Sequence, residues 1–211
     1  MLRLGLTGGI ASGKSAVAAM LRDMGFAVLD ADSLAHKLIE PGQPAYGEVV
    51  HDFGQTVLAA GGRVDRAKLS AIVFNDRAKL DRLNAIVHPR VAEVIFSQFE
   101  VWRRAGVRDA VFVEAALLIE SGIHKNLDGL VVAWCRPEQQ FERLLARGLS
   151  AAEARRRIAA QLPVEEKLRL ATEKIDCSGS LEETRRQVEA LASKLRHTLP
   201  RNKPSPHGAV T

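Results

Sequence analysis

The sequence predicts a three-layer α/β fold in which a parallel sheet of about five strands lies between helices, with a helical insertion and a helical lid. The apolar segment 2–7 leads through a glycine-rich turn into a helical pattern over 15–24. A continuous apolar run of strand length follows at 26–30, which is typical of a parallel strand covered on both faces. Apolar runs recur at 110–114 and 129–135, each followed by helix-forming sequence.

The segment between the second and third predicted strands carries no strand pattern of similar quality. Its apolar residues recur at helical spacing, and clusters of proline and glycine separate the helical stretches. We expect helices over 33–40, 66–74, 77–87 and 91–104. The last two are divided at Pro89, because the residue before a proline disfavours helix. Residues 33–106 are therefore predicted to form a helical insertion.

The last third of the chain is predicted to contribute a lid, the final strand and the final helix. A helix over 138–147 is followed by a second helix with a polar face, and we expect residues 141–171 to form a hinged lid. A short strand at 174–176 precedes a helix over 181–199. The prolines and polar residues of 200–211 predict a disordered tail.

Length and composition fit one soluble domain with inserted lobes and exclude a large multidomain protein. The chain has 211 residues, 46% of them hydrophobic and 5% aromatic, and a formal net charge of +5. No apolar run is long enough for a secretory signal or a membrane span, so we expect a cytoplasmic protein without membrane contact. Cys135 and Cys177 lie far apart without metal-ligand spacing, which predicts reduced thiols.

The most specific motif lies between the first strand and the first helix. The pattern G-x-x-x-x-G-K-[ST] is met by Gly8-Gly9-Ile10-Ala11-Ser12-Gly13-Lys14-Ser15. Glycines let backbone N–H groups surround nucleotide phosphates, Lys14 adds a positive charge, and the Ser15 hydroxyl can bind Mg²⁺. We therefore assign residues 9–15 to ATP. The alternative is a glycine turn that happens to precede Lys-Ser and binds no nucleotide. A dinucleotide-binding site is excluded, because its pattern G-x-G-x-x-G is not met.

Carboxylates lie at the carboxyl ends of the second and third predicted strands, at the sheet edge that carries the phosphate loop. If ATP donates a phosphoryl group to a hydroxyl of a second substrate, a carboxylate must position that hydroxyl and take its proton, and Asp32 is the candidate for this role. The alternative is that Asp32 caps the helix beginning at residue 33. Glu114 is a candidate for holding Mg²⁺ through water, or is a surface acid. His36, one turn after Asp32, and His88 are candidate substrate contacts, or packing and capping residues.

Two arginines follow the fourth predicted strand. Arg143 and Arg147 share a helix face because they lie four residues apart, and an anion between them would relieve their repulsion. We assign both to the phosphates of ATP, and Arg143 also to the charge of the transition state. The next helix opens with a capping box of Ser150 and Glu153 and is predicted to belong to the lid that excludes water from the site.

Together these motifs resemble the bacterial dephospho-CoA kinase family. The resemblance rests on residues 6–15, on 29–32 followed by His36, and on 83–89, and it runs from residue 2 to about residue 195. It implies a P-loop kinase-like fold. It also implies Mg²⁺-dependent transfer of the γ-phosphate of ATP to the ribose 3′-hydroxyl of dephospho-CoA, the last step of coenzyme A synthesis.

The resemblance implies roles for residues along the chain. Lys14 and Ser15 would serve ATP and Mg²⁺, Asp32 the acceptor hydroxyl, and Arg143 the phosphates. Thr7, directly before the loop, is a further candidate substrate contact.

The resemblance also implies a division into lobes. The insertion 33–106 would cover the acceptor, and the nucleotide-binding core would comprise 1–32, 107–140 and 172–199. Two departures stand out. The chain has Glu-Ala-Ala-Leu-Leu from Glu114, where the family usually shows Asp-Val-Pro-Leu-Leu. Cys177 stands where the family tends to have asparagine, so any contact to adenine there must come from the backbone.

Two alternatives to this function remain open at the level of sequence. A nucleoside monophosphate kinase or a sugar kinase would share the loop, the sheet and the lid. A nucleotide-dependent switch or a nucleic-acid-stimulated ATPase would share the loop and the basic charge, but few aromatic residues lie among the basic clusters. We expect a monomer that acts on a small molecule and does not bind nucleic acid.

Overall fold

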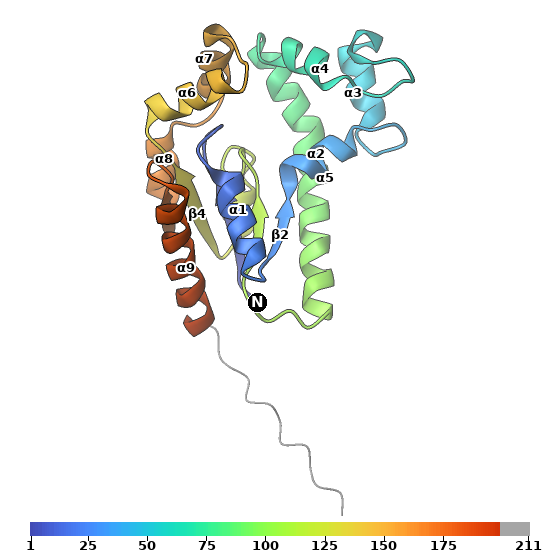
Figure 1. Cartoon of the computed structure of the whole chain (residues 1–211). Coiled ribbons are helices and arrows are strands. Elements are labelled where there is room, and N and C mark those ends of the chain that lie inside the picture. The colour runs from blue at the N-terminus through green and yellow to red at the C-terminus, as the bar shows by residue number, and fades with distance from the viewer. Residues whose placement is uncertain (199–211) are drawn as a thin grey trace, which may run out of the picture.

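A computed structural model describes residues 1–198 of the chain, and the predicted tail 200–211 lies outside the described residues. As predicted, five parallel strands form one sheet, in the order β2-β3-β1-β4-β5 (Figure 1). They are β1 (Arg3–Thr7), β2 (Ala27–Asp30), β3 (Val111–Glu114), β4 (Gly129–Trp134) and β5 (Glu173–Asp176). The central position of β1 puts the phosphate loop in the middle of one sheet edge.

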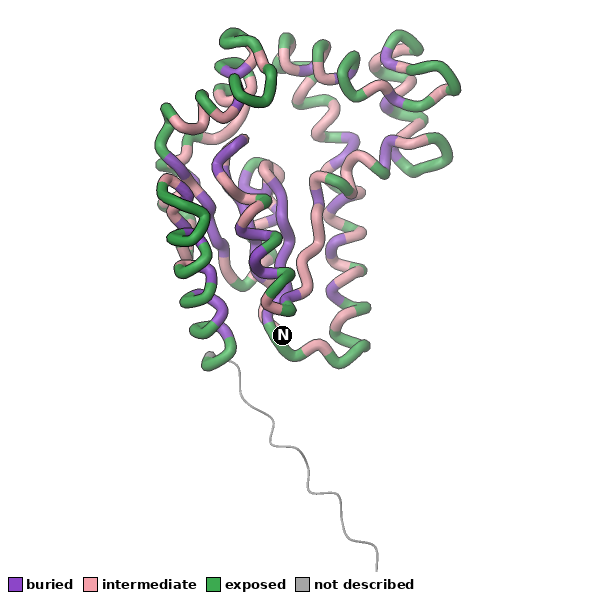
Figure 2. The backbone as a smooth tube through the Cα atoms, viewed as in Figure 1, coloured by how far each residue is buried: buried purple, intermediate pink, exposed green. Residues whose placement is uncertain are grey.

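The strands send alternate side chains into two apolar cores. Phe112 packs toward α1 (Lys14–Asp23) and α9 (Leu181–Thr198), whereas its neighbour Val113 packs into the core shared with the inserted helices. Figure 2 shows the resulting buried sheet between more exposed helices. Because both faces are covered, the strands need apolar residues at consecutive positions, and this explains their continuous apolar runs in the sequence.

The insertion is helical, and its first helices form a lobe beyond the edge of the sheet that carries the phosphate loop (Figure 1). Its elements are α2 (Ala31–Leu38), α3 (Tyr46–Phe53), a 3₁₀ turn η1 (Gln55–Val57), α4 (Arg66–Val73) and α5 (Arg77–Arg104). The short helix α3 was not predicted. Its eight residues are followed by Gly54, which has a φ of 76°.

Helix α5 corrects the prediction of two helices divided at Pro89. The helix continues through this proline, which removes one N–H donor from its hydrogen-bond ladder. The guanidinium of Arg90 donates to the carbonyl of Ile86 at 2.5 Å, which gives that turn an additional hydrogen bond. Val91 and Ile95 bury the following turns in the core beside the sheet. Burial of this helix face outweighs the local preference of proline.

The helices after β4 lie along the opposite side of the site from the inserted lobe (Figure 1). They are α6 (Pro137–Ala146), α7 (Ala151–Ala159) and α8 (Val164–Leu170), which lie between β4 and β5 in the sequence. On the other side of β4 in the sequence, a 3₁₀ turn η2 (Ile123–Asn126) connects β3 to β4. Ser150 caps α7, because its hydroxyl accepts from the N–H of Glu153 at 3.2 Å, whereas the Glu153 carboxylate of the predicted capping box pairs with Arg157. Within residues 1–198, no helix is long and apolar enough to cross a membrane.

Candidate active site

The phosphate loop between β1 and α1 is packed so closely that its glycines have no room for a side chain. A Cβ at Gly13 would lie 2.7 Å from the Cβ of Cys177, and a Cβ at Gly8 would lie 2.2 Å from the carbonyl oxygen of Ala133. Gly13 also has a φ of 107°, which side chains strongly disfavour. These contacts explain why glycine stands at both ends of the motif.

Side chains from α6 and from the segment between α7 and α8 hold the loop from outside. The N–H of Ile10 donates to Oε1 of Gln161 at 2.7 Å, and its carbonyl accepts from Nε2 of Gln140 at 2.6 Å. Arg143 donates to the carbonyl of Ala11 at 3.2 Å. The sequence pattern predicts no role for the two glutamines, because a lone glutamine carries no spacing signal. Only the folded chain brings them to the loop.

Lys14 meets the two predicted carboxylates at the edge of the sheet. Its Nζ lies 3.1 Å from Oδ2 of Asp32 and 3.0 Å from Oε1 of Glu114. The second oxygen of Glu114 is 3.2 Å from Nη2 of Arg22, and Glu114 is buried. Asp32, which follows β2, and Glu114, the last residue of β3, therefore converge on the first residue of α1, as the parallel sheet predicts.

Asp32 is not the cap of α2, so the capping hypothesis is wrong. The helix begins at Ala31, earlier than predicted, and Asp30 caps it by accepting from the N–H of Ser33 at 2.8 Å. Asp32 is left free to point toward the site, where its two oxygens accept from the N–H of Ala116 at 3.3 Å and 3.2 Å. Its carboxylate therefore has one backbone donor and one ammonium beside it.

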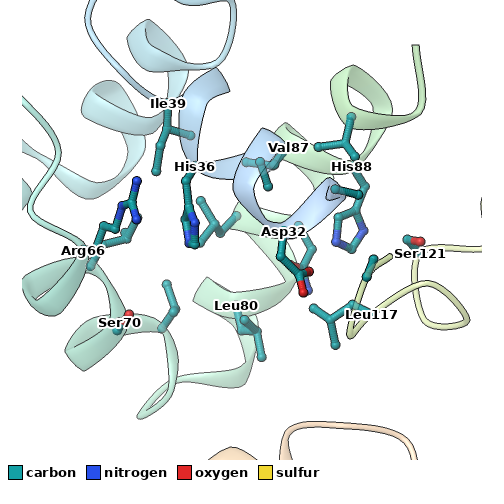
Figure 3. Close-up of a pocket in the computed structure, with 18 of the residues that line it drawn as sticks. Asp32, His36, Ile39, Arg66, Ser70, Leu80, Val87, His88, Leu117 and Ser121 are labelled. Carbon is teal, nitrogen blue, oxygen red and sulfur yellow. The ribbon is translucent and has the colours of Figure 1, made fainter. Parts of the chain in front are cut away.

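A cleft opens beside Asp32 toward the inserted lobe (Figure 3). Its walls are mainly apolar and come from α2, α4, α5 and the segment after β3. His36 and Arg66 lie near each other on one side, and His88 lies on the other side near Ser121. The two histidines predicted as substrate contacts therefore border the same cleft as Asp32, and Arg66 is a lining residue that the sequence analysis did not single out.

Both cleft histidines favour the neutral form. Burial, together with the nearby charge of Arg66, lowers the pKa of His36 below its ordinary value. Burial also lowers the pKa of His88. The cleft thus presents neutral imidazoles beside one permanent cation.

Arg143 and Arg147 border one hollow beside Gly13, as their shared helix face predicts. The guanidinium of Arg143, however, also donates to the carbonyl of Cys177 at 2.8 Å, so it braces the backbone on both sides of the loop. The structure gives no support to the prediction that Thr7 contacts the substrate. Its side chain is fully buried, and its hydroxyl donates to the carbonyl of Ala116 at 3.2 Å.

The residues at the loop fit a magnesium ion that arrives with a nucleotide. Ser15 is exposed in the first turn of α1, and its hydroxyl is the kind of oxygen ligand that Mg²⁺ accepts. Among the described residues, no group of three acidic, histidine or cysteine side chains could hold a metal ion. Mg²⁺ normally keeps several waters and binds nucleotide phosphates, so it needs no such cage. Both oxygens of Glu114 already face cations, which gives its predicted metal role no support.

This chain matches the family model of the dephospho-CoA kinases and relatives that carry that name. The model of the dephospho-CoA kinase family matches residues 2–183. The dephospho-CoA kinase of Carboxydothermus hydrogenoformans is 44% identical over 90% of this chain and 93% of its own length. A solved structure from Thermus thermophilus is 37% identical, with a TM-score of 0.75 over 92% of this chain and 97% of that chain.

A dephospho-CoA kinase structure from Campylobacter jejuni is 27% identical, with a TM-score of 0.68 over 93% of this chain and 98% of that chain. A shikimate kinase from Bacteroides thetaiotaomicron, 14% identical with a TM-score of 0.50 over 92% of this chain and 98% of that chain, shares the fold alone. The family model and the curated relative each cover most of the chain, and the residues matched by the family model include the phosphate loop, Asp32 and the cleft. This chain therefore belongs to the dephospho-CoA kinase family.

Proposed function

We propose that the chain transfers the γ-phosphate of ATP to the ribose 3′-hydroxyl of dephospho-CoA, giving coenzyme A and ADP. One observation carries the proposal: Asp32 lies 3.1 Å from Lys14 of the phosphate loop and also borders the cleft under the inserted lobe. The site for a phosphoryl donor and the site for an acceptor therefore meet at one carboxylate. Membership of the family supports dephospho-CoA as that acceptor.

The nucleotide side relies on backbone groups and on Lys14. The N–H groups of residues 9–15 and the positive end of α1 attract the phosphates of ATP. Mg²⁺, held by the phosphates and by Ser15, would neutralise phosphate charge when bound. We propose that the phosphates draw Lys14 away from Asp32, while Glu114 keeps its contact with Arg22. Asp32 then becomes free to accept a proton.

The acceptor side relies on Asp32. Its carboxylate would accept the proton of the 3′-hydroxyl as the hydroxyl oxygen attacks the γ-phosphorus and the bond to the β-phosphate oxygen breaks. The N–H of Ala116 holds this carboxylate while the proton moves. Arg143 and Arg147 border the hollow beside the loop, and we propose that they bind the negatively charged phosphates of ATP.

The cleft would hold the rest of the acceptor. Its apolar walls suit the organic part of dephospho-CoA, and Arg66 offers a charge for the diphosphate, with His36 and His88 as neutral hydrogen-bonding groups. The division into a core, an acceptor lobe over 33–106 and a lid over 141–171 belongs to this proposal. So do a monomeric state, a cytoplasmic location and the absence of nucleic-acid binding.

Replacing Asp32 by asparagine tests the mechanism. Asp32→Asn keeps the size of the side chain but removes the charge that accepts the proton, so turnover should fall by at least about 10²-fold. ATP binding and the melting temperature should stay close to those of the wild type. The matched control is Asp30→Asn, since asparagine is as good a helix cap as aspartate and this variant should keep its activity.

A panel of acceptors tests the substrate. We expect ADP release from wild-type protein to rise with dephospho-CoA and not with nucleoside monophosphates, shikimate or sugars. Equal release with a sugar or a nucleoside monophosphate would replace the proposed acceptor. Wild-type turnover in the Asp32→Asn variant would instead remove Asp32 from the mechanism while leaving the acceptor standing.

A further inference from the structure

Lys167 on α8 is a buried cation that the mechanism above does not use. Its side chain is fully buried, whereas Leu170 on the same helix is 49% exposed. Removing an ammonium group from water is costly, whereas removing a leucine side chain from water is favourable, so packing alone does not account for this arrangement. The position of the ammonium group points to a polar role.

The ammonium group of Lys167 is held by two acceptors next to the site. Its Nζ donates to the carbonyl of Ala116 at 2.8 Å and lies 2.9 Å from Oε1 of Glu120. The same carbonyl accepts from the hydroxyl of Thr7 at 3.2 Å. On its other side, Ala116 donates its N–H to both oxygens of Asp32. One alanine therefore connects the buried cation to the proposed proton acceptor.

Glu120 extends this network to the helices that hold the phosphate loop. The oxygen that pairs with Lys167 also accepts from the N–H of Leu162 at 2.9 Å. Leu162 lies between α7 and α8, next to Gln161, which holds the N–H of Ile10 in the loop. The ion pair thus connects the segment after α7 with the peptide that faces Asp32.

We propose that Lys167 is a positioning residue for phosphoryl transfer, which fixes Ala116 so that its N–H holds the carboxylate of Asp32. Glu120 completes the arrangement by neutralising the ammonium group and tying it to Leu162. The inference rests on the proposed role of Asp32. Because Lys167 is fully buried, it acts through Ala116 and does not touch the substrate.

The test removes both charges of the pair at once. Lys167→Met alone would leave the Glu120 carboxylate without its cation and could unfold the chain for that reason. The double variant Lys167→Met/Glu120→Gln keeps the apolar stem and an oxygen for the N–H of Leu162. We expect kcat to fall at least about tenfold, because small misplacements of reacting groups are costly, while the KM for ATP stays within about twofold. The control is Arg169→Met, an exposed change on the same helix.

A second measurement does not depend on activity. In protein labelled with ¹⁵N-alanine, hydrogen exchange at the amide of Ala116 should be faster in the double variant, while that of Ala133 in β4 should not change. An unchanged Ala116 amide, or an unchanged kcat, would overturn the proposal. If the wild type fails to phosphorylate dephospho-CoA, the proposed function falls, but Ala116 exchange still tests the positioning. If the double variant does not fold, Glu120→Asp, which keeps the carboxylate charge but shortens its reach toward Lys167, should give a smaller increase in Ala116 exchange.

Discussion

The phosphate loop and the acceptor cleft meet at Asp32 but are built differently. The loop is formed by backbone, and glycines, Gln140, Gln161 and Arg143 fix it from several elements. The cleft is formed by side chains on the inserted helices, and its walls are mainly apolar. A change in the loop should therefore disturb every step of the reaction. A change in the cleft should disturb only the acceptor.

The largest effect is expected in the loop, from Gly13→Ala. The new Cβ would meet Cys177 at 2.7 Å in a backbone conformation with a φ of 107°. We expect kcat/KM for ATP to fall by at least about 10²-fold as the loop shifts, together with a lower melting temperature. The control is Gly25→Ala, where φ is 89° but nothing lies within 4 Å. If Gly25→Ala lowers the melting temperature but not kcat/KM for ATP, backbone strain alone does not explain the kinetic loss in Gly13→Ala. Equal losses of kcat/KM in the two variants would contradict the special role of the loop.

A smaller and more selective effect is expected in the cleft, from Arg66→Leu. Loss of one charged contact to a diphosphate should raise the KM for dephospho-CoA by about tenfold or more, with the KM for ATP unchanged. The control is Arg63→Leu, because Arg63 pairs with Glu40 on the surface of the same lobe.

The same variant has a spectroscopic readout. Burial and the charge of Arg66 lower the pKa of His36, so removing Arg66 should raise that pKa, as measured by NMR titration. Parallel increases in both KM values, or no effect on either, would show that Arg66 is not specific to the acceptor.

The smallest effect is expected beneath the loop, where burial of Cys177 changes only the pH dependence of the reaction of its thiol with an alkylating reagent. Burial raises the pKa of its thiol to about 11, so the thiolate is scarce at pH 8 and increases about tenfold with each pH unit below that value. Alkylation of the native protein should be slow and should keep rising between pH 8 and pH 10. In guanidinium chloride the rate should level off near pH 9, and a native rate that levels off there as well would show that the thiol reacts only after local unfolding.

Much of the fold was predictable because the strands are covered on both faces. Burial on both sides requires continuous apolar runs, and all five strands are found close to their predicted positions. The helix boundaries were less predictable. Pro89 predicts a break by its local chemistry, yet the core that buries Val91 and Ile95 keeps α5 continuous. Local signals describe a residue and its neighbours along the chain, whereas burial depends on the whole molecule.

Within the site, the sequence by itself determined the groups whose chemistry depends on short spacing. The loop requires glycines, a lysine and a serine at fixed intervals, and Asp32 must follow a strand beside it. Tertiary structure alone decided that Asp30 rather than Asp32 caps α2, that Thr7 is buried, and that Lys167 reaches Ala116. These outcomes join residues far apart in the chain or depend on which way a side chain points. Neither is encoded in local spacing, because both follow from how the layers pack.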